Sequence, residues 1–258
     1  MTRFTSYRIA FQTILTKEIL RFCRIWIQTL LPPAITTALY FIIFGHLIGE
    51  RIGEMDGVRY IDFIVPGLIL MAVITNSYSN VVSSFFSSKY QRHVEELLIS
   101  PVPNWVILSG YVGGGLARGV LVGIAVTAVS LLFSDLDIRS FGWTLAVFVL
   151  TSILFALAGF INAVYAKSFD DISIVPTFVL TPLTYLGGVF YSISMLPGFW
   201  QKISLANPVL YMVNAFRYGL LGVTDIPIGI ALAIILLFIA GLTAFSLYLL
   251  NHGVGVKS

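Results

Sequence analysis

Polar side chains recur along one apolar stretch of the sequence at the spacing of a helix face. Asn76, Asn80, Ser83, Ser84 and Ser87 follow one another at intervals of four, three, one and three residues. On a helix they share one face. Such a face is costly against lipid, so it indicates the protein interior or a wet pathway. Close packing of two helices through small polar residues is the alternative.

One cation stands inside the next apolar run. Arg118 comes 14 residues after Asn104, which places it ~21 Å along a helix axis, near the middle of a bilayer. All 12 acids lie in the terminal segment, the loops or the ends of apolar runs. In an antiparallel neighbour, Asn76 and Asn80 reach the level of Arg118 and can accept its hydrogen bonds. We predict a pathway of Asn76, Asn80, Ser84 and Arg118 in which Arg118 attracts an anionic group of a cargo, with a purely structural role as the alternative.

A short charged segment separates these two runs. It reads "KYQRHVEELLISPVPNW" over residues 89–105. Its "EELL" contains helix formers, and Pro101 and Pro103 then end the helix, which leaves room for two or three turns. Mixed acidic, basic and apolar side chains are typical of a contact surface outside the membrane. An ordinary solvated loop is the alternative.

Enzyme signatures are missing from the sequence. The three histidines, His46, His93 and His252, fall in separate segments, and neither H-E-x-x-H nor G-x-S-x-G occurs. Asp170 and Asp171 lack a third acid at metal-site spacing, which favours a solvated capping turn. There is also no G-x-x-x-x-G-K-[ST] loop for nucleotide phosphates. We therefore expect no cofactor or metal in this chain, and any ATP with its Mg²⁺ must be bound by a partner.

Composition indicates an all-α polytopic membrane protein. Only 10% of residues are charged and the mean hydropathy is +0.94, which excludes a soluble domain; a net charge of +3 is too small for a nucleic-acid surface. Residues 1–258 form one domain without strong internal repeats. We predict six spans, at residues 28–48, 62–88, 104–133, 141–166, 172–191 and 226–250. Five Lys and Arg before the first span, against two basic residues and three acids in the loop at 50–61, put both termini in the cytoplasm.

The N-terminal segment 1–25 is predicted to be an interfacial amphipathic helix. Lys17, Arg21 and Arg24 share one face and would point to anionic headgroups. The alternative is that this segment is only the cytoplasmic end of the first span, which has no signal-peptidase site and is retained.

Glycines and prolines determine how two of the spans pack. Gly115, Gly119 and Gly123 recur every four residues and make a flat groove for close helix approach. Pro176 and Pro182 remove hydrogen bonds from the span at 172–191, so we expect it to be kinked or mobile.

The segment 192–225 is too apolar for an ordinary loop. Pro197, Gly198, Asn207 and Pro208 divide it into two short amphipathic pieces. We predict an external re-entrant helical hairpin rather than a surface loop.

The chain resembles the permease subunit of the ABC-2 family of ATP-driven exporters along nearly its full length. Three stretches carry the resemblance, "EELLISPVP", "DDISIVPTFVLTPLTYLGGVFYS" and "NPVLYMVNAFRYGLLG". It implies a type V (ABCG-like) exporter fold, a homodimer and two ATP-binding cassette subunits. By position, the coupling helix within 89–103 comprises Glu95, Glu96, Leu97, Leu98, Ser100 and Pro101. The gate or hinge would involve Pro176, Pro182, Pro197, Asn207 and Pro208.

The sequence therefore predicts a permease of a bacterial inner membrane that exports an amphiphilic or lipid-like cargo with energy from a separate ATPase. A stand-alone channel or an ion-driven transporter is the rival function, but it needs coupling charges inside the spans, and only Arg118 is present. A lipid-modifying enzyme lacks a nucleophile, base or metal constellation.

Overall fold

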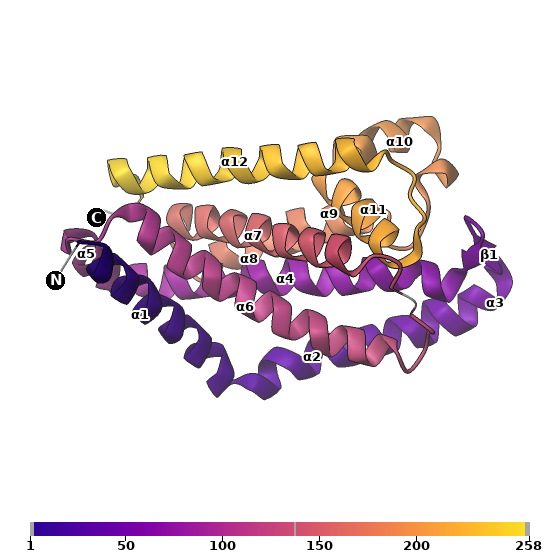
Figure 1. The fold of residues 1–258 in the computed structure, drawn as a ribbon, viewed down its shortest axis with the longest axis horizontal. Helices are drawn as coiled ribbons and strands as arrows, with labels where there is room; N and C mark the ends of the chain where they lie inside the picture. Colours follow the sequence, from indigo (N-terminus) through magenta and orange to yellow (C-terminus); the bar gives the residue numbers. More distant parts are fainter. Residues whose placement is uncertain (1–2, 137, 256–258) are drawn as a thin grey trace.

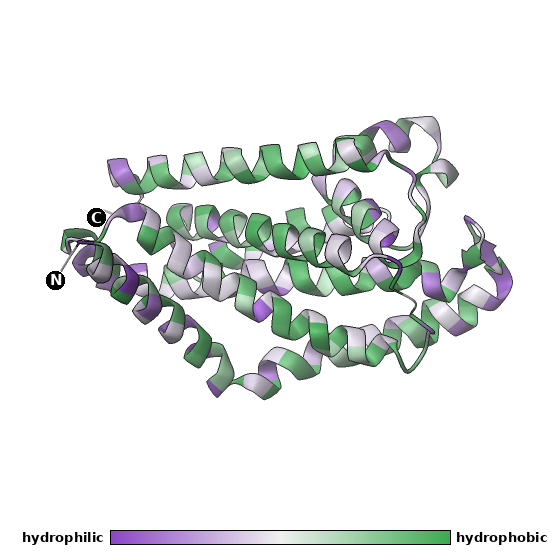
Figure 2. Cartoon of the chain, viewed as in Figure 1, coloured by the Kyte–Doolittle hydropathy of each residue, from purple (hydrophilic) through white to green (hydrophobic). Residues whose placement is uncertain are grey.

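Long helices lie side by side in an elongated bundle (Figure 1). The structure is a computed structural model, and it describes residues 3–136 and 138–255. Within these residues, five helical segments are long and apolar enough to cross a membrane. They are α2 (Trp26–Tyr40) continued by η1 (Phe41–Ile48) and α3 (Gly49–Ile52), α4 (Tyr60–Tyr90), α6 (Asn104–Ser130), α7 (Phe141–Tyr165) and α12 (Ile228–His252). Figure 2 shows apolar residues along their length and hydrophilic residues towards the ends of the bundle and along α1 (Arg3–Arg24).

The predicted span at 172–191 is not a full-length helix. Its helical part consists of α8 (Asp171–Val175), the π-helical η2 (Pro176–Leu180) and α9 (Thr181–Tyr185). At 1.5 Å per residue this is about 22 Å, less than the ~30 Å of a hydrocarbon core. The prolines explain the π segment, because each removes a backbone donor, and Gly188 at φ +73° prevents a continuation.

The capping turn predicted before this segment is present. The Asp171 carboxylate accepts hydrogen bonds from the backbone N–H groups of Lys167 (2.8 Å) and Ser168 (3.1 Å). The bond from the Lys167 backbone is the main cause that lowers the pKa of Asp171. Asp171 therefore closes the turn in front of α8, whereas the N-cap of the helix is Asp170, whose side chain makes no capping hydrogen bond.

Helix α4 is the centre of the bundle. In its most apolar window 72% of the residues are buried, against 11% in α12. A helix that is covered on nearly all sides is a core helix, whereas α12 leaves most of its apolar surface for lipid or a partner. The polar face of α4 must therefore be satisfied by protein groups.

Glycines let the neighbouring helices approach α4 closely, as the spacing in α6 predicts. A Cβ on Gly115 would lie 2.7 Å from Val81 Cγ2, and one on Gly119 would lie 3.0 Å from Ser152 Oγ of α7. At Gly159 of α7 the neighbour is backbone and cannot rotate away, because a Cβ there would lie 2.5 Å from the carbonyl oxygen of Tyr78. These contacts confirm close packing as a role of the glycine stripe.

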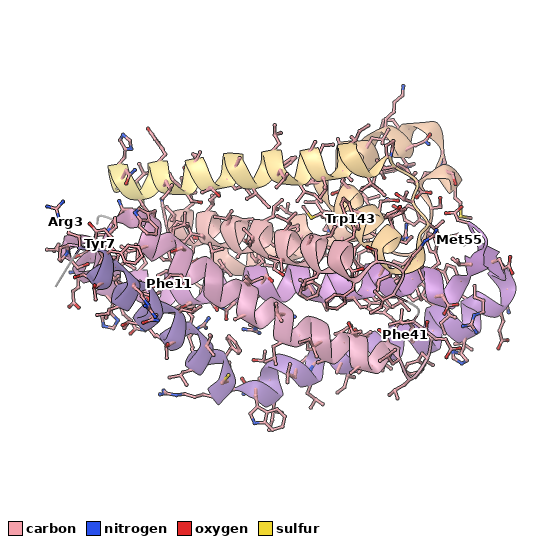
Figure 3. All side chains as sticks on the ribbon, in the orientation of Figure 1. Arg3, Tyr7, Phe11, Phe41, Met55 and Trp143 are labelled. Carbon is pink, nitrogen blue, oxygen red and sulfur yellow. The ribbon has the colours of Figure 1, made fainter. Side chains whose placement is uncertain are left out.

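The two ends of the bundle carry different elements. Figure 3 shows Arg3 and Tyr7 at one end and Met55 at the other. Helix α5 (His93–Ile99) and the last turn of α12 lie at the end of Arg3, and a short hairpin of β1 (Glu54–Met55) and β2 (Val58–Arg59) lies at the opposite end. An Asp56–Gly57 turn with positive φ at both residues joins the two strands, and it was missed by the all-α prediction although Asp-Gly is a hairpin signal.

The two predicted pieces of the segment 192–225 are both helical. They are α10 (Gly198–Leu205) and α11 (Pro208–Leu221), and the short 3₁₀ turn η3 (Ile193–Met195) precedes them. Pro197 is the N-cap of α10, and Asn207 is the N-cap of α11, where its side-chain oxygen accepts from Val209 N at 2.9 Å. The boundaries set by proline, glycine and asparagine are therefore confirmed.

Close packing at Gly159 yields a direct test. Gly159→Ala should lower the midpoint of thermal unfolding in detergent by several degrees, because overpacking against a backbone carbonyl costs about 1–3 kcal/mol. Gly241→Ala on α12 is the matched control, since a Cβ there meets nothing within 4 Å. Equal midpoints for the two variants would contradict this packing.

Candidate functional site

Helix α5 is a two-turn knob that directly follows the core helix α4. Arg92 adopts the left-handed conformation (φ +64°), which turns the chain out of α4. Glu95 and Glu96 lie in the first turn, where the helix dipole favours acids. Ser100 is extended, as a residue before proline must be, so the helix ends before Pro101 as predicted.

The side chains of α5 face two ways. Val94 is buried, and Leu97 and Leu98 pack partly buried against the core, so the two leucines anchor the knob. Glu96 is exposed, and Ile99 is 86% exposed. This isoleucine stands at the C-terminal end of α5, one turn after the exposed Glu96, and its side chain is available for contact with another chain. The sequence analysis missed Ile99, although it follows the predicted "EELL" stretch directly.

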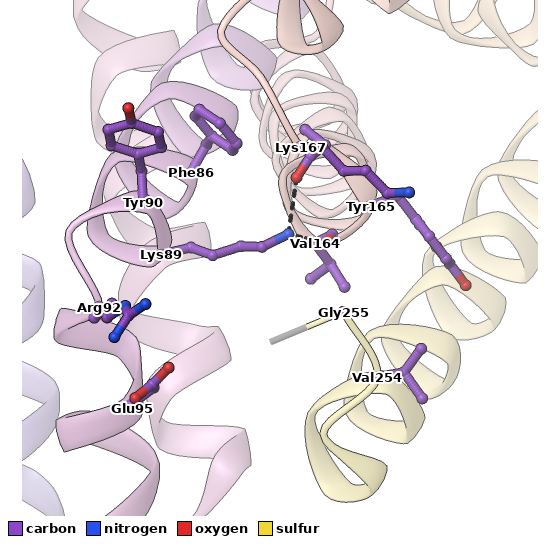
Figure 4. A pocket seen from close by; sticks show the side chains of 11 residues that line it. Phe86, Lys89, Tyr90, Arg92, Glu95, Val164, Tyr165, Lys167, Val254 and Gly255 are labelled. Atoms are coloured by element: carbon purple, nitrogen blue, oxygen red, sulfur yellow. Dashed lines mark hydrogen bonds between the residues drawn. The ribbon is translucent and has the colours of Figure 1, made fainter. Parts of the chain in front are cut away.

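A basic cleft of about 520 Å³ lies beside α5 (Figure 4). Lys89 reaches across it from α4 and donates to the carbonyl oxygens of Val164 (2.5 Å) and Ala166 (2.8 Å) at the end of α7. A cation at a helix C-terminus is favourable, because it meets unpaired carbonyls and the negative end of the dipole. Lys89 thereby fastens the base of the knob to the bundle.

The polar face of α4 is occupied by charges from α1. Glu18 is fully buried, accepts a hydrogen bond from Ser84 Oγ (2.5 Å) and pairs with Arg21 Nη2 (3.3 Å). Arg21 also donates to the backbone oxygen (2.8 Å) and Oδ1 (2.9 Å) of Asn80 and to Ser83 Oγ (3.3 Å). The prediction that Arg21 points to headgroups is therefore wrong, because the unsatisfied polar groups of α4 attract it inward.

Glycines of α6 make room for this insertion. A Cβ on Gly114 would lie 2.5 Å from Glu18 Cβ, and one on Gly110 would lie 2.6 Å from Ile14 Cγ2. Helix α1 thus packs along α6 through Ile14, Glu18 and Phe22, its buried residues. The signal for Glu18 was available, since it is the only acid of a basic segment and stands one turn from Arg21.

The four predicted pathway residues divide into two groups. Asn80 and Ser84 bind the charges of α1, whereas Arg118 Nη2 donates to Asn76 Oδ1 at 3.2 Å. The expected contact between Arg118 and Asn76 is confirmed, and the one with Asn80 is replaced by Arg21. Asn76 and Arg118 also line a cavity of about 340 Å³ between α2, α4 and α6.

Comparison with known protein families matches most of the chain. Residues 9–221 match the family described as ABC-2 type transporter. The chain belongs to that family. As the sequence predicts, it is the multi-pass membrane subunit of an ABC transporter.

Two relatives illustrate the range of similarity of this ABC-2 subunit. It is 57% identical over 252 residues, 98% of each chain, to the inner membrane transport permease YadH of Escherichia coli (strain K12). It is 25% identical over 193 residues, 74% of each chain, to nodulation protein J of Rhizobium meliloti (strain 1021).

The predicted hinge residues of the ABC-2 subunit lie at element boundaries. Pro176 begins η2, Pro182 lies in the first turn of α9, and Pro208 begins α11. Asn207 Nδ2 donates to the carbonyl oxygen of Leu183 at 2.6 Å. This asparagine therefore joins the short fifth segment to the helices α10 and α11, so that the two parts are mechanically linked.

Arg217 of α11 is buried and holds together the end of the bundle opposite to α5. Its Nη2 donates to the carbonyl oxygen of Gly188 at 2.6 Å, and its guanidinium carbon lies 3.8 Å from the centre of the Phe63 ring. Asp225 lies 4.0 Å away and accepts from Ser192 Oγ and from Ile193 N. Arg217 thus connects the hairpin, the end of the fifth segment and α4, and sequence reasoning missed it because nothing local distinguishes it.

The buried Glu18 gives a second test. Glu18→Gln should loosen α1, because the amide cannot balance Arg21 and charge-assisted hydrogen bonds are worth about 1.5–3 kcal/mol. The measurement is hydrogen exchange of backbone amides in residues 3–24, which should become faster. Lys17→Gln, at an exposed position of the same helix, should leave the exchange unchanged; faster exchange in both variants would contradict a specific role of Glu18.

Proposed function

We propose that this chain is the membrane-spanning half of an ATP-driven exporter that moves an amphiphilic or lipid-like cargo across a bacterial inner membrane. The observation that carries the proposal is the shape of α5, a short helix anchored by Val94, Leu97 and Leu98 whose outer side presents Glu96 and a nearly bare Ile99. Two ATP-binding cassette subunits would bind ATP and Mg²⁺ and seat this knob, since the chain has no phosphate-binding loop of its own.

A second copy of the chain would complete the transporter. The short fifth segment exposes Phe178 (72%), Ile174 (50%) and Val179 (45%). Beside it lies a cavity of about 320 Å³ that Met71 and Thr75 of α4 also line. A helix too short to cross the bilayer alone and apolar on its outer side fits an interface between two copies, with the cargo path next to it. This favours a homodimer with the fifth segment at the interface. Helix α4 is mostly covered within one chain and would contribute to the interface only through the residues around Met71 and Thr75.

The proposed motion starts in the cytoplasm. When two ATPase subunits close on ATP, the α5 knobs would move with them, and the fastened set of α5, α4, α1 and α7 would tilt as a body. At the outer side the tilt would reach the hairpin through Asn207 and Arg217. Both termini would lie in the cytoplasm, on the side of α5.

Docking through α5 is tested by one substitution. Ile99→Ser should weaken co-purification of the partner ATPase by about ten-fold or more, because burying an isoleucine contributes about 1.5–3 kcal/mol. Ile138→Ser is the control, since Ile138 is an exposed isoleucine (44%) in the loop between α6 and α7. ATPase binding that survives Ile99→Ser unchanged would count against the knob.

Coupling is tested separately by charge reversal. Glu96→Lys, at an exposed position of α5, should lower cargo-stimulated ATP hydrolysis in proteoliposomes several-fold while membrane insertion stays normal. The reason is a mismatched charge in the contact, which repels instead of attracting. Glu95→Lys is expected to act in the same direction, and wild-type stimulation in both variants would remove these acids from the coupling surface.

A further inference from the structure

A groove on the side of the bundle leads from the lipid to Arg118. Its cavity has a volume of about 340 Å³ and lies between α2, α4 and α6. The α2 side consists of Gln28, Pro32, Pro33, Thr36 and Thr37. Met71, Ala72, Thr75 and Asn76 of α4 and Arg118 of α6 complete the lining. Gln28, Thr36 and Thr75 are exposed, whereas Asn76 at the bottom is buried. The groove is therefore wide at the lipid side and polar at its base.

The charge at the base of this groove is not balanced by an acid among residues 3–136 and 138–255. The four ion pairs among the described residues do not include Arg118. Its Nη2 donates to the neutral Asn76 Oδ1, and its buried Nε has no hydrogen-bond partner. A cation at mid-depth of a membrane protein is costly, and it is kept where it meets a counter-charge or a polar pathway. A guanidinium with free donors matches a phosphate or carboxylate in geometry as well as in charge.

The walls of the groove suit a polar headgroup. Pro32 and Pro33 have no backbone N–H, so the helical hydrogen bonds to the carbonyls of residues 28 and 29 are not made. The carbonyl of Gln28 and the exposed side chains of Gln28 and Thr36 offer partners for hydroxyl or amine groups around an anion, whereas Thr29 is buried and does not line the groove. Apolar chains attached to such a headgroup can stay in the lipid that surrounds α2.

The groove continues along α4. Met71 and Thr75 line both this cavity and the cavity of about 320 Å³ beside η2 and α9. At the far cavity, Tyr40 of α2 and Tyr185 of α9 share a hydrogen bond between their hydroxyls at 2.9 Å. A headgroup held at Arg118 is thus next to the short, proline-bearing segment proposed to lie at the dimer interface.

We propose that the groove between α2, α4 and α6 is a lateral binding site for the anionic headgroup of a lipid-like cargo, with Arg118 as its counter-ion and Asn76 orienting the guanidinium. This inference rests on the proposed export function and names the chemistry of its cargo: one phosphate or carboxylate on an apolar anchor. The headgroup enters sideways from the bilayer, and its acyl chains remain outside the protein.

The test measures binding of short-chain phosphatidylglycerol to the purified full chain by native mass spectrometry, with phosphatidylcholine of equal chain length as the neutral comparison. The wild type should prefer phosphatidylglycerol. Arg118→Gln should reduce this preference about ten-fold or more, and Arg118→Lys should keep part of it, because charge remains while the planar fork is lost. Lys202→Gln removes an equal charge at an exposed position of α10 and should change nothing.

Two further measurements distinguish a lipid site from an unstable variant and from a site for a free anion. Thr36→Trp fills the mouth of the groove from an exposed position and should lower phosphatidylglycerol binding with Arg118 intact, which covers the case of an unstable Arg118→Gln. Inorganic phosphate should not compete; full competition at equal concentration would overturn the lipid headgroup in favour of a free anion. Wild-type lipid preference in Arg118→Gln and in Thr36→Trp would overturn the site.

ATP hydrolysis by the complex with the ATPase separates this inference from the proposed function. Loss of lipid preference together with loss of phosphatidylglycerol-stimulated hydrolysis in Arg118→Gln, while Lys202→Gln keeps both, supports the site and the exporter. An Arg118-dependent lipid preference in a chain that binds no ATPase would retain the site and overturn the exporter. Stimulated hydrolysis that survives Arg118→Gln with no lipid preference would retain the exporter and overturn the site.

Discussion

The need to satisfy the polar face of α4 without water determines how the rest of the subunit is arranged. An unpaired polar group in hydrocarbon costs several kcal/mol, so each residue on that face needs a protein partner. Helix α1 supplies two of them by inserting Glu18 and Arg21 against Ser84 and Asn80. Only the mid-membrane part, at Asn76, meets a charge that no acid of the described chain balances. One face of α4 thus holds the N-terminal helix at the part nearer to α5 and opens to a groove at its centre.

The same contacts make the end of the bundle that carries α5 a stiff unit. Lys89 joins the end of α4 to the last carbonyls of α7, and α1 is held to α4 and to the glycines of α6. Helix α5 grows out of this unit after a single turn at Arg92. Because packed helices shift as bodies instead of deforming continuously, the proposed force on the knob would be passed to α4 rather than lost in a flexible loop. The short fifth segment with its π turn is the weak element, and it is the place where a motion of α4 can be taken up.

Local signals allowed much of the fold to be predicted from the sequence, and tertiary contacts account for most of what was missed. Of the six spans predicted from hydropathy, five are long apolar helices among the described residues. Pro101, Pro197 and Asn207 mark true helix boundaries, because these residues act on the backbone next to them. The docking of Arg21 on Asn80 and the burial of Arg217 depend on residues far away in the chain, which a helical wheel cannot show. The fifth span was overextended because hydropathy ignores the missing donors of its prolines. The contact between Asn76 and Arg118 was predicted correctly from their depth in the membrane alone. The exposure of Ile99 could not be predicted in this way, because it depends on how Val94, Leu97 and Leu98 pack against the bundle.

The central claim is that work enters this subunit through α5 and moves α4 with it. The most direct measurement is the distance between two spin labels, one on each copy of the chain in the proposed dimer. Each label is attached to His93→Cys, an exposed position at the start of α5. The Cys23→Ser substitution removes the single native cysteine. In the assembled transporter in lipid nanodiscs, the two labels should come closer by several ångströms when ATP is bound and return after hydrolysis. An unchanged distance during continuous ATP turnover and cargo transport would contradict the account.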